Sequence, residues 1–145
     1  MSMYGIGAIK GGVNSTDNSR QCADGNYVYI GFPRGKHPSI DRIFDAMKPG
    51  DLVYVKSSNQ QGLSIKSIHI ITDDAVYSNE GGTMGNHVGY YRDAYCLWSA
   101  DVEEGWLHIP LNSDRLANIR ASVVYPELDV DVQMLIAKTI KERLQ

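Results

Sequence analysis

The sequence is poor in cysteine, has no long apolar run and carries no excess of basic residues, and each lack excludes a class of protein. Its two cysteines, Cys22 and Cys96, are too few for a disulfide scaffold, and neither lies in a Cys-x-x-Cys pair with metal-ligand spacing. We therefore expect two reduced thiols, no metal and no other cofactor. The longest apolar run, residues 94–98, is far shorter than the roughly 20 residues that cross a bilayer, so we expect no membrane partner.

The charge balance excludes a further class. Lys and Arg number 14 against 17 Asp and Glu, a net charge of −3, whereas a protein that wraps duplex nucleic acid through bulk charge needs many Lys and Arg on one face. A small pocket or a single basic rim stays open. The N-terminus, Met1-Ser2-Met3-Tyr4, lacks the basic and apolar regions of a signal peptide, which predicts a cytoplasmic protein.

What the sequence does contain is typical of one globular domain. The 145 residues are 43% hydrophobic and 21% charged, close to the average of globular proteins. We therefore predict a single domain over residues 1–145, with neither extensive disorder nor an internal repeat.

The apolar pattern predicts short strands and two helices. Strands are expected over residues 3–9, 27–32, 51–56, 62–72, 90–98, 106–109 and 121–125. Apolar residues at helical spacing predict a short helix near 39–48 and an amphipathic C-terminal helix near 129–144. Residues 10–26 are expected to be a long polar loop, and residues 78–89 a glycine-rich one. This order predicts an α+β fold with a mostly antiparallel β-barrel.

Two local patterns add detail. Leu63 and Ile65 alternate with polar neighbours, and Ile68 and Ile70 then alternate out of phase with them, which predicts a β-bulge near Lys66-Ser67. In the first strand, Gly5 and Gly7 share one side, which indicates that a neighbouring segment or a ligand packs close to the backbone there.

The order of elements resembles the PUA-like superfamily, particularly its EVE, YTH and ASCH branches. The most specific piece is the turn Lys48-Pro49-Gly50-Asp51, which joins a helix to a strand. The other pieces are Tyr4-Gly5-Ile6-Gly7, Tyr29-Ile30-Gly31-Phe32 and the run from Leu63 to Asp73, so that the resemblance covers roughly residues 3–77. It implies a PUA-like barrel that binds RNA, modified bases or nucleotide-like molecules. Some ASCH-type relatives resemble hydrolases.

Aromatic residues are the first candidates for a binding pocket, because a base that has left its stack is held well between aromatic faces. The candidates for the pocket wall are Tyr4, Phe32, Tyr90, Tyr91 and Trp98. Phe32 has the strongest claim, since it lies where a predicted strand meets the loop Pro33-Arg34-Gly35-Lys36. Tyrosine is also a common strand residue, so a purely structural role stays open for each of them.

Polar residues complete the predicted site. Arg34 and Lys36, with Gly35 between them, could contact phosphate, and Lys10 would join them if the first two strands pair. Ser57 and Asn59 could hydrogen-bond to a base edge. A solvated loop explains the same residues.

The function predicted from these features is non-catalytic recognition of a nucleotide, a modified base or a short nucleic-acid segment in an aromatic-lined pocket. One alternative is a small ASCH-like hydrolase of nucleosides or RNA, in which Lys10, Glu80 and Thr83 would have to converge. Another is an acidic protein-interaction module of the inhibitor or immunity type, because tyrosine is favoured at interfaces. The sequence contains no recognisable catalytic motif, so no catalytic residue is assigned.

Overall fold

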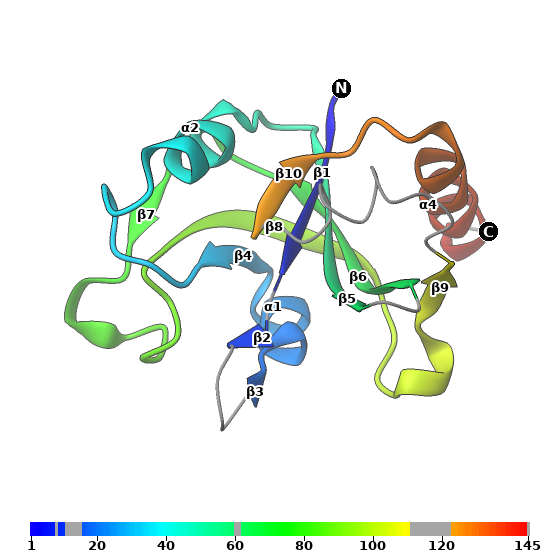
Figure 1. Cartoon of the computed structure of the whole chain (residues 1–145), viewed down its shortest axis with the longest axis horizontal. Helices are drawn as coiled ribbons and strands as arrows, with labels where there is room; N and C mark the ends of the chain where they lie inside the picture. Colours follow the sequence, from blue (N-terminus) through cyan, green and yellow to red (C-terminus); the bar gives the residue numbers. More distant parts are fainter. Residues whose placement is uncertain (8, 11–15, 60–61, 111–122, 145) are drawn as a thin grey trace.

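The computed structural model describes residues 1–7, 9–10, 16–59, 62–110 and 123–144. In these residues the chain forms an α+β fold, in which helices flank one strongly curved sheet (Figure 1). The helices are α1 (Ser19–Gly25), α2 (Pro38–Ala46) and α4 (Val130–Arg143), with short 3₁₀ turns η1 (Glu80–Gly82) and η2 (Glu103–Gly105). The strands are β1 (Met3–Gly7), β2 (Ile9–Lys10), β3 (Thr16–Asp17), β4 (Tyr27–Ile30), β5 (Leu52–Asn59), β6 (Gly62–Ile71), β7 (Tyr77–Ser78), β8 (Tyr90–Ser99), β9 (Leu107–Ile109) and β10 (Val124–Pro126).

The sheet is mostly antiparallel and curls through half a barrel. Its strands follow the order β10-β1-β5-β6-β8-β4, with β7 paired to β8 and β9 paired to β6. The pairing of β1 with β5 is parallel, because the segment between them, which includes α1, β4 and α2, brings the chain back to the end of the sheet at which β1 began. The predicted α+β, mostly antiparallel architecture is thus confirmed.

A bulge in β6 lies where the sequence predicted it. Val55 of β5 pairs with Ser67 and the next residue, Lys56, pairs with Ile65, so that Lys66 is the extra residue on β6. A second irregularity separates Ile68 from His69 in the pairing with β8. Bulges bend a strand and increase its twist, and these two lie in the strands around which the sheet curls.

Apolar residues gather on both sides of the sheet. One cluster joins β1, β4 and β5 to α2, and includes Phe44, whose ring meets Tyr90 edge to face. The other cluster lies against α4, which contributes Val132 and Ile136. The sheet is therefore covered on both faces, which explains why strands such as β4 are buried throughout rather than at alternate positions.

Both predicted helices are present. The helix expected near 39–48 is α2, and Pro38 opens it at a position where its missing N–H costs nothing. The helix expected near 129–144 is α4, and the Asp129 carboxylate caps it by accepting hydrogen bonds from the backbone N–H groups of Asp131 and Val132.

The segment 10–26 departs from its prediction. Instead of one long loop, its described residues contain β3 and α1, a helix of two turns that buries Cys22. Its sequence shows too little apolar periodicity to reveal a helix, because one buried side chain suffices to hold it. Moreover, β1 pairs with β5 and β10 whereas β4 pairs with β8, so the condition that was to bring Lys10 to the Phe32 loop is not met.

The glycine at position 5 accommodates neighbouring side chains. A Cβ at Gly5 would lie 2.5 Å from Cζ of Tyr125 and 2.7 Å from Cζ of Tyr54. The hydroxyl oxygens of Tyr54 and Tyr125 lie 2.6 Å apart, and the Tyr54 hydroxyl donates a hydrogen bond of 2.6 Å to the buried Glu127 carboxylate. The close approach indicated by Gly5 is therefore that of two tyrosine rings from adjacent strands.

No helix in the described parts of the chain is both long and apolar enough to cross a membrane.

Candidate functional site: a pocket around Lys66

Within the described residues, the predicted aromatic side chains lie at several different places in the fold. Phe32, partly buried, meets the edge of the His37 ring at 4.6 Å, and the two rings help line a groove between α2 and β10. Tyr90 is buried in the core, while Tyr91 stacks on Tyr77 at 5.4 Å, with its side chain on the other side of the strand. Tyr4 of β1 is buried in the cluster that β1, β4 and β5 form with α2, and Trp98 packs in the cluster next to α4.

The basic loop is occupied by the carboxylates of α2. Arg34 forms an ion pair with Asp45, and its guanidinium lies 5.1 Å from the ring centre of Tyr90. The backbone N–H of Gly35 donates to the Asp41 carboxylate at 2.9 Å. Lys36 lies over the Phe32 ring, 5.5 Å from its centre. Phe32, Arg34, Lys36 and Tyr90 therefore lie near one another, but two of the groups expected to meet phosphate already contact carboxylates.

The remaining predicted residues lie elsewhere in the fold or outside the described part of the structure. Ser57 stands on β5, opposite Ser64 of β6. The side chains of Lys10 and Asn59 are outside the described part of the structure, although their backbones belong to β2 and β5. Glu80 lies in η1 and Thr83 directly after it. The roles predicted for all these residues stay predictions.

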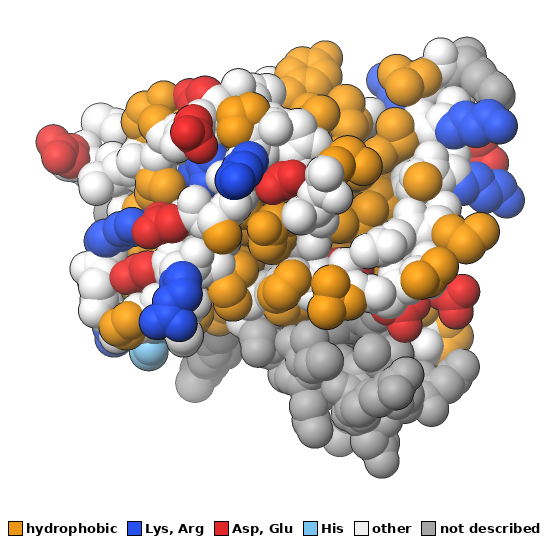
Figure 2. All heavy atoms as spheres, turned by 90° about the horizontal axis from the view of Figure 1, so that it is seen from above, with side chains coloured by type: hydrophobic (Ala, Val, Ile, Leu, Met, Phe, Trp, Pro, Cys, Tyr) orange, Lys and Arg blue, Asp and Glu red, His pale blue; other side chains and the backbone are white. Residues whose placement is uncertain are grey.

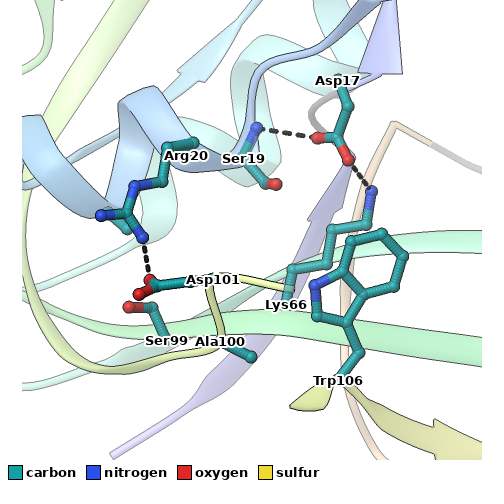
Figure 3. A pocket seen from close by; sticks show the side chains of 9 residues that line it. Asp17, Ser19, Arg20, Lys66, Ser99, Ala100, Asp101 and Trp106 are labelled. Carbon is teal, nitrogen blue, oxygen red and sulfur yellow. Dashed lines mark hydrogen bonds and ion pairs between the residues drawn. The ribbon is translucent and has the colours of Figure 1, made fainter. Parts of the chain in front are cut away.

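A polar cavity with a different set of residues lies between α1, the bulge of β6 and the turn after β8. We call it the Lys66 pocket. Its volume is about 160 Å³, and it is lined by Asp17, Ser19, Arg20, Ala23, Lys66, Ser99, Ala100, Asp101 and Trp106 (Figure 3).

Lys66 is the central residue of this pocket. Its side chain is only 3% exposed, and its ammonium group forms an ion pair with Asp17. On its other side, Nζ lies 4.4 Å from the centre of the Trp106 ring, within the range of a cation–π interaction. Figure 3 shows the Lys66 side chain running past the indole toward Asp17. A buried ammonium needs such partners, because an unpaired charge in this position would cost several kcal/mol, on the order of 3–5 when a partner is removed.

Asp17 joins this lysine to the start of α1. One carboxylate oxygen accepts the ion pair with Lys66, and the other accepts a hydrogen bond from the backbone N–H of Ser19 at 2.9 Å. Burial by itself would raise the pKa of Asp17, but the hydrogen bonds from Lys66 and Ser19 outweigh it and hold that pKa below its usual range. Asp17 is therefore ionised at neutral pH.

Arg20 forms the outer rim. It makes ion pairs with Asp101 across the pocket and with Asp24 one turn along α1. These pairs are exposed, and we expect them to orient the side chains rather than to stabilise the fold. The rim thus consists of opposite charges that solvent reaches.

The local sequence explains how these residues meet. The bulge adds Lys66 to β6, and the backbone N–H of Ala100 donates to the Lys66 carbonyl at 3.1 Å, which fixes the turn after β8 beside it. Gly105 lets that turn fold back, because a Cβ there would lie 3.1 Å from the Cβ of Ala100. Trp106 follows directly and is thereby placed over the lysine.

Sequence reasoning had not assigned any of these residues to a site. One signal was available: the change of phase at Lys66-Ser67 marked a bulge, and bulges are over-represented next to functional sites. In the sequence, Asp101 belongs to an acidic run that is typical of a solvated loop, and Trp106 begins the predicted strand over residues 106–109. Arg20, the partner of Asp101, lies 81 residues away in sequence, and Asp17, the partner of Lys66, lies 49 residues away, so only the fold reveals the pocket.

Other reactive groups are arranged for structure. His69 is buried and neutral: burial lowers its pKa to about 4, and its ring nitrogens lie within hydrogen-bond distance of the Ser67 hydroxyl and the Ala94 carbonyl. Burial raises the pKa of the Cys22 thiol to about 12, which makes it a poor nucleophile. Across the described residues, no three His, Cys, Asp or Glu side chains are grouped so that they could hold a metal ion.

A second, larger cavity is mostly apolar. It lies between β1, the end of β10 and α4, has a volume of about 470 Å³, and is bordered by the exposed side chains of Met1, Leu128 and Met134. Figure 2 shows hydrophobic side chains gathered on the face of the molecule that this view presents. The cavity between β1, β10 and α4 offers few polar groups to orient a ligand, in contrast to the Lys66 pocket.

No model of a known protein family matches this sequence, and the curated proteins include no match to it.

Proposed function

We propose that this chain is a PUA-like domain that binds a single nucleobase in the Lys66 pocket without transforming it. The base could belong to a free nucleoside or nucleotide, or to a nucleic-acid strand from which it has been turned out. The observation that carries the proposal is the buried Lys66, held between Asp17 and Trp106 beside an open polar cavity.

The size of the pocket supports a small ligand. Its volume of about 160 Å³ is below the roughly 300–1,000 Å³ of pockets that hold drug-sized molecules. One heterocyclic ring system therefore fits the cavity better than a whole nucleotide. Any sugar and phosphate would extend past the exposed rim formed by Arg20 and Asp101.

The chemistry of the lining supports a base in particular. Trp106 offers an aromatic surface, and stacking on an aromatic side chain contributes roughly 1–3 kcal/mol per base. Around it stand the hydroxyls of Ser19 and Ser99 and the carboxylates of Asp17 and Asp101. A base edge carries alternating hydrogen-bond donors and acceptors, which such groups complement.

The PUA-like assignment rests on the predicted resemblance together with the curled, mostly antiparallel sheet. The turn Lys48-Pro49-Gly50-Asp51 does join α2 to β5, and β5 forms a hairpin with β6, as the resemblance implied. The predicted stacking role of Phe32 is a separate prediction, because Phe32 lines another groove.

Fluorescence of Trp106 tests the proposal. The chain has two tryptophans, so a Trp98→Phe variant leaves Trp106 as the sole reporter in the pocket. We expect a saturable change in its emission with at least one nucleoside, and a matching rise in melting temperature, since a ligand that binds only the native state stabilises it. Trp106→Ala should weaken nucleoside binding by about 1–3 kcal/mol, whereas Trp106→Phe should retain most of the affinity. Isothermal titration calorimetry measures the affinity of both variants.

The matched control is Tyr95→Ala, which removes an exposed aromatic ring of β8 outside the pocket and should leave affinity unchanged. A flat response of Trp106 to all four common nucleosides and to single-stranded oligonucleotides would contradict the proposal. Conversion of a bound nucleoside into product, lost in Lys10→Met or Glu80→Gln, would instead support the hydrolase that the sequence left open.

A further inference from the structure

The cations of the Lys66 pocket are already bound to carboxylates. Lys66 pairs with Asp17 and lies on Trp106, while Arg20 contacts both Asp24 and Asp101. An anionic ligand would have to displace one of these carboxylates from its partner. Among the described residues, three carboxylates stand near two cations, and this small negative excess disfavours phosphate inside the pocket.

What the pocket still offers is capacity to accept hydrogen bonds. A carboxylate has about four lone-pair positions. Asp101 uses one oxygen for Arg20, and within the described residues no group donates to the other; its side chain is 73% exposed at the mouth of the pocket. The carboxylate of Asp17 lies deeper and is 36% exposed, so it too retains contact with the cavity.

The donors in the pocket are less available. Of the five guanidinium N–H donors, Arg20 directs one on Nε at Asp24 and one on Nη1 at Asp101, so that part of its donor capacity is in use, and the Lys66 ammonium is held between a carboxylate and an aromatic ring. The serine hydroxyls of Ser19 and Ser99 can serve in either direction. The open positions therefore favour a ligand that brings its own N–H donors.

We infer that the Lys66 pocket selects heterocycles that carry an exocyclic amino group, of the cytosine and adenine type, over their keto counterparts and over free phosphate. The inference rests on the proposed function and names its ligand class. An exocyclic amino group presents two N–H donors to the carboxylate of Asp101. Uracil and hypoxanthine present a single ring N–H there, beside a carbonyl oxygen whose lone pairs the carboxylate repels.

The experiment compares matched nucleosides on the Trp98→Phe reporter: cytidine with uridine, adenosine with inosine, and inorganic phosphate as the anion. A hydrogen bond to a charged group contributes about 1.5–3 kcal/mol, so the amino compound of at least one pair should bind about tenfold more tightly or better. Phosphate at millimolar concentration should not displace it. Hexanucleotides of dC and dU, used in parallel, show whether a free nucleoside or a base in a strand is preferred.

Asp101→Asn tests the residue assigned to the selection. The variant loses the charge but keeps the shape, and the preference between cytidine and uridine should fall to less than threefold. Glu104→Gln is the control, because it removes a neighbouring exposed carboxylate that does not line the pocket, and it should leave the preference as it is. Both variants should melt within a degree of the parent, since both side chains are exposed.

The outcomes separate the two proposals. Equal affinity within both pairs, a preference for the keto compounds, or displacement by phosphate would overturn the inference while nucleobase binding stands. A preference that survives in Asp101→Asn would likewise overturn it. If no nucleoside or hexanucleotide binds, both the inference and the proposed function fail.

Discussion

Two buried lysines, Lys56 and Lys66, lie close together on the paired strands β5 and β6, yet their surroundings differ. Lys66 is the bulged residue and reaches a carboxylate, an indole ring and an open cavity. Lys56, 5% exposed, pairs with Ile65, and its ammonium lies 5.4 Å from the centre of the Tyr125 ring. Burial lowers the pKa of Lys56 to about 8.

The difference shows how one extra residue in a strand changes which groups a buried charge contacts. In a regular strand, side chains alternate between the two faces, so that Ile68 and Ile70 would lie on the face opposite to Leu63 and Ile65 and away from the cluster against α4. With the bulge, both apolar pairs face α4 and the lysine is directed to α1 and Trp106. The sealed region around Tyr54, Tyr125 and Glu127 favours stability, whereas the Lys66 pocket keeps polar groups within reach of a ligand.

Removing the carboxylate of Asp17, the ion-pair partner of Lys66, should have the largest effect on stability. We expect Asp17→Asn to lower the free energy of unfolding by about 3 kcal/mol, because a nearly buried ammonium loses its counter-charge. Urea titration measures this. The double variant Asp17→Asn with Lys66→Met should recover most of the loss, since it removes the unpaired charge and keeps an apolar chain on Trp106. A double variant as unstable as the single one would show that the charge is not the cause.

The second largest loss of stability is expected from a side chain added at Gly5, next to the rings of Tyr54 and Tyr125. Gly5→Ala places a methyl group 2.5 Å from Cζ of Tyr125, and the hydrogen bonds among Tyr54, Tyr125 and Glu127 oppose a shift of that ring. We expect a loss of about 2–3 kcal/mol in urea titration. Gly35→Ala is unsuitable as a control because of its positive φ, but Gly7→Ala is suitable, since a Cβ there has ordinary spacing. Equal losses for Gly5→Ala and Gly7→Ala would contradict the explanation.

The titration of Lys56 provides a pH test. Its pKa is about 8 in the folded protein and about 10.5 in the unfolded chain, so between these values the unfolded chain binds more protons. Stability should therefore rise with pH, by about 2 kcal/mol from pH 7 to 9.5. Chemical denaturation at several pH values measures the rise, and Lys56→Met should remove it. A rise of the same size in Lys56→Met would assign it to other groups.

The smallest effect is expected at the Phe32 groove. If the base binds in the Lys66 pocket, Phe32→Ala should change nucleoside affinity by less than twofold, because Phe32 lines a different cavity. Calorimetry with the nucleoside that binds best makes the measurement. A loss of about 1–3 kcal/mol in a folded Phe32→Ala variant would instead place the stacking surface where the sequence suggested it.

Much of the fold could be predicted because its signals are local. The helices α2 and α4, the hairpin of β5 and β6, and the bulge at Lys66 follow from the spacing of apolar residues over short windows. Helix α1 was missed because a single buried residue, Cys22, anchors it. The parallel pairing of β1 with β5 does not follow from local patterns either, since the two strands are separated in sequence by α1, β4 and α2.

In the candidate site too, local patterns predict some features, while contacts between distant segments decide the others. The sequence by itself determined the alternation and its change of phase, and thus that Lys66 departs from the regular strand. Only the tertiary structure decided what that lysine meets, because Asp17, Arg20, Asp101 and Trp106 come from distant segments and no spacing rule relates them. The same holds for Arg34, whose charge was visible in sequence but whose partner Asp45 was decided by folding. Periodicity determines which face a residue occupies, whereas the partners of a charge depend on how the elements pack.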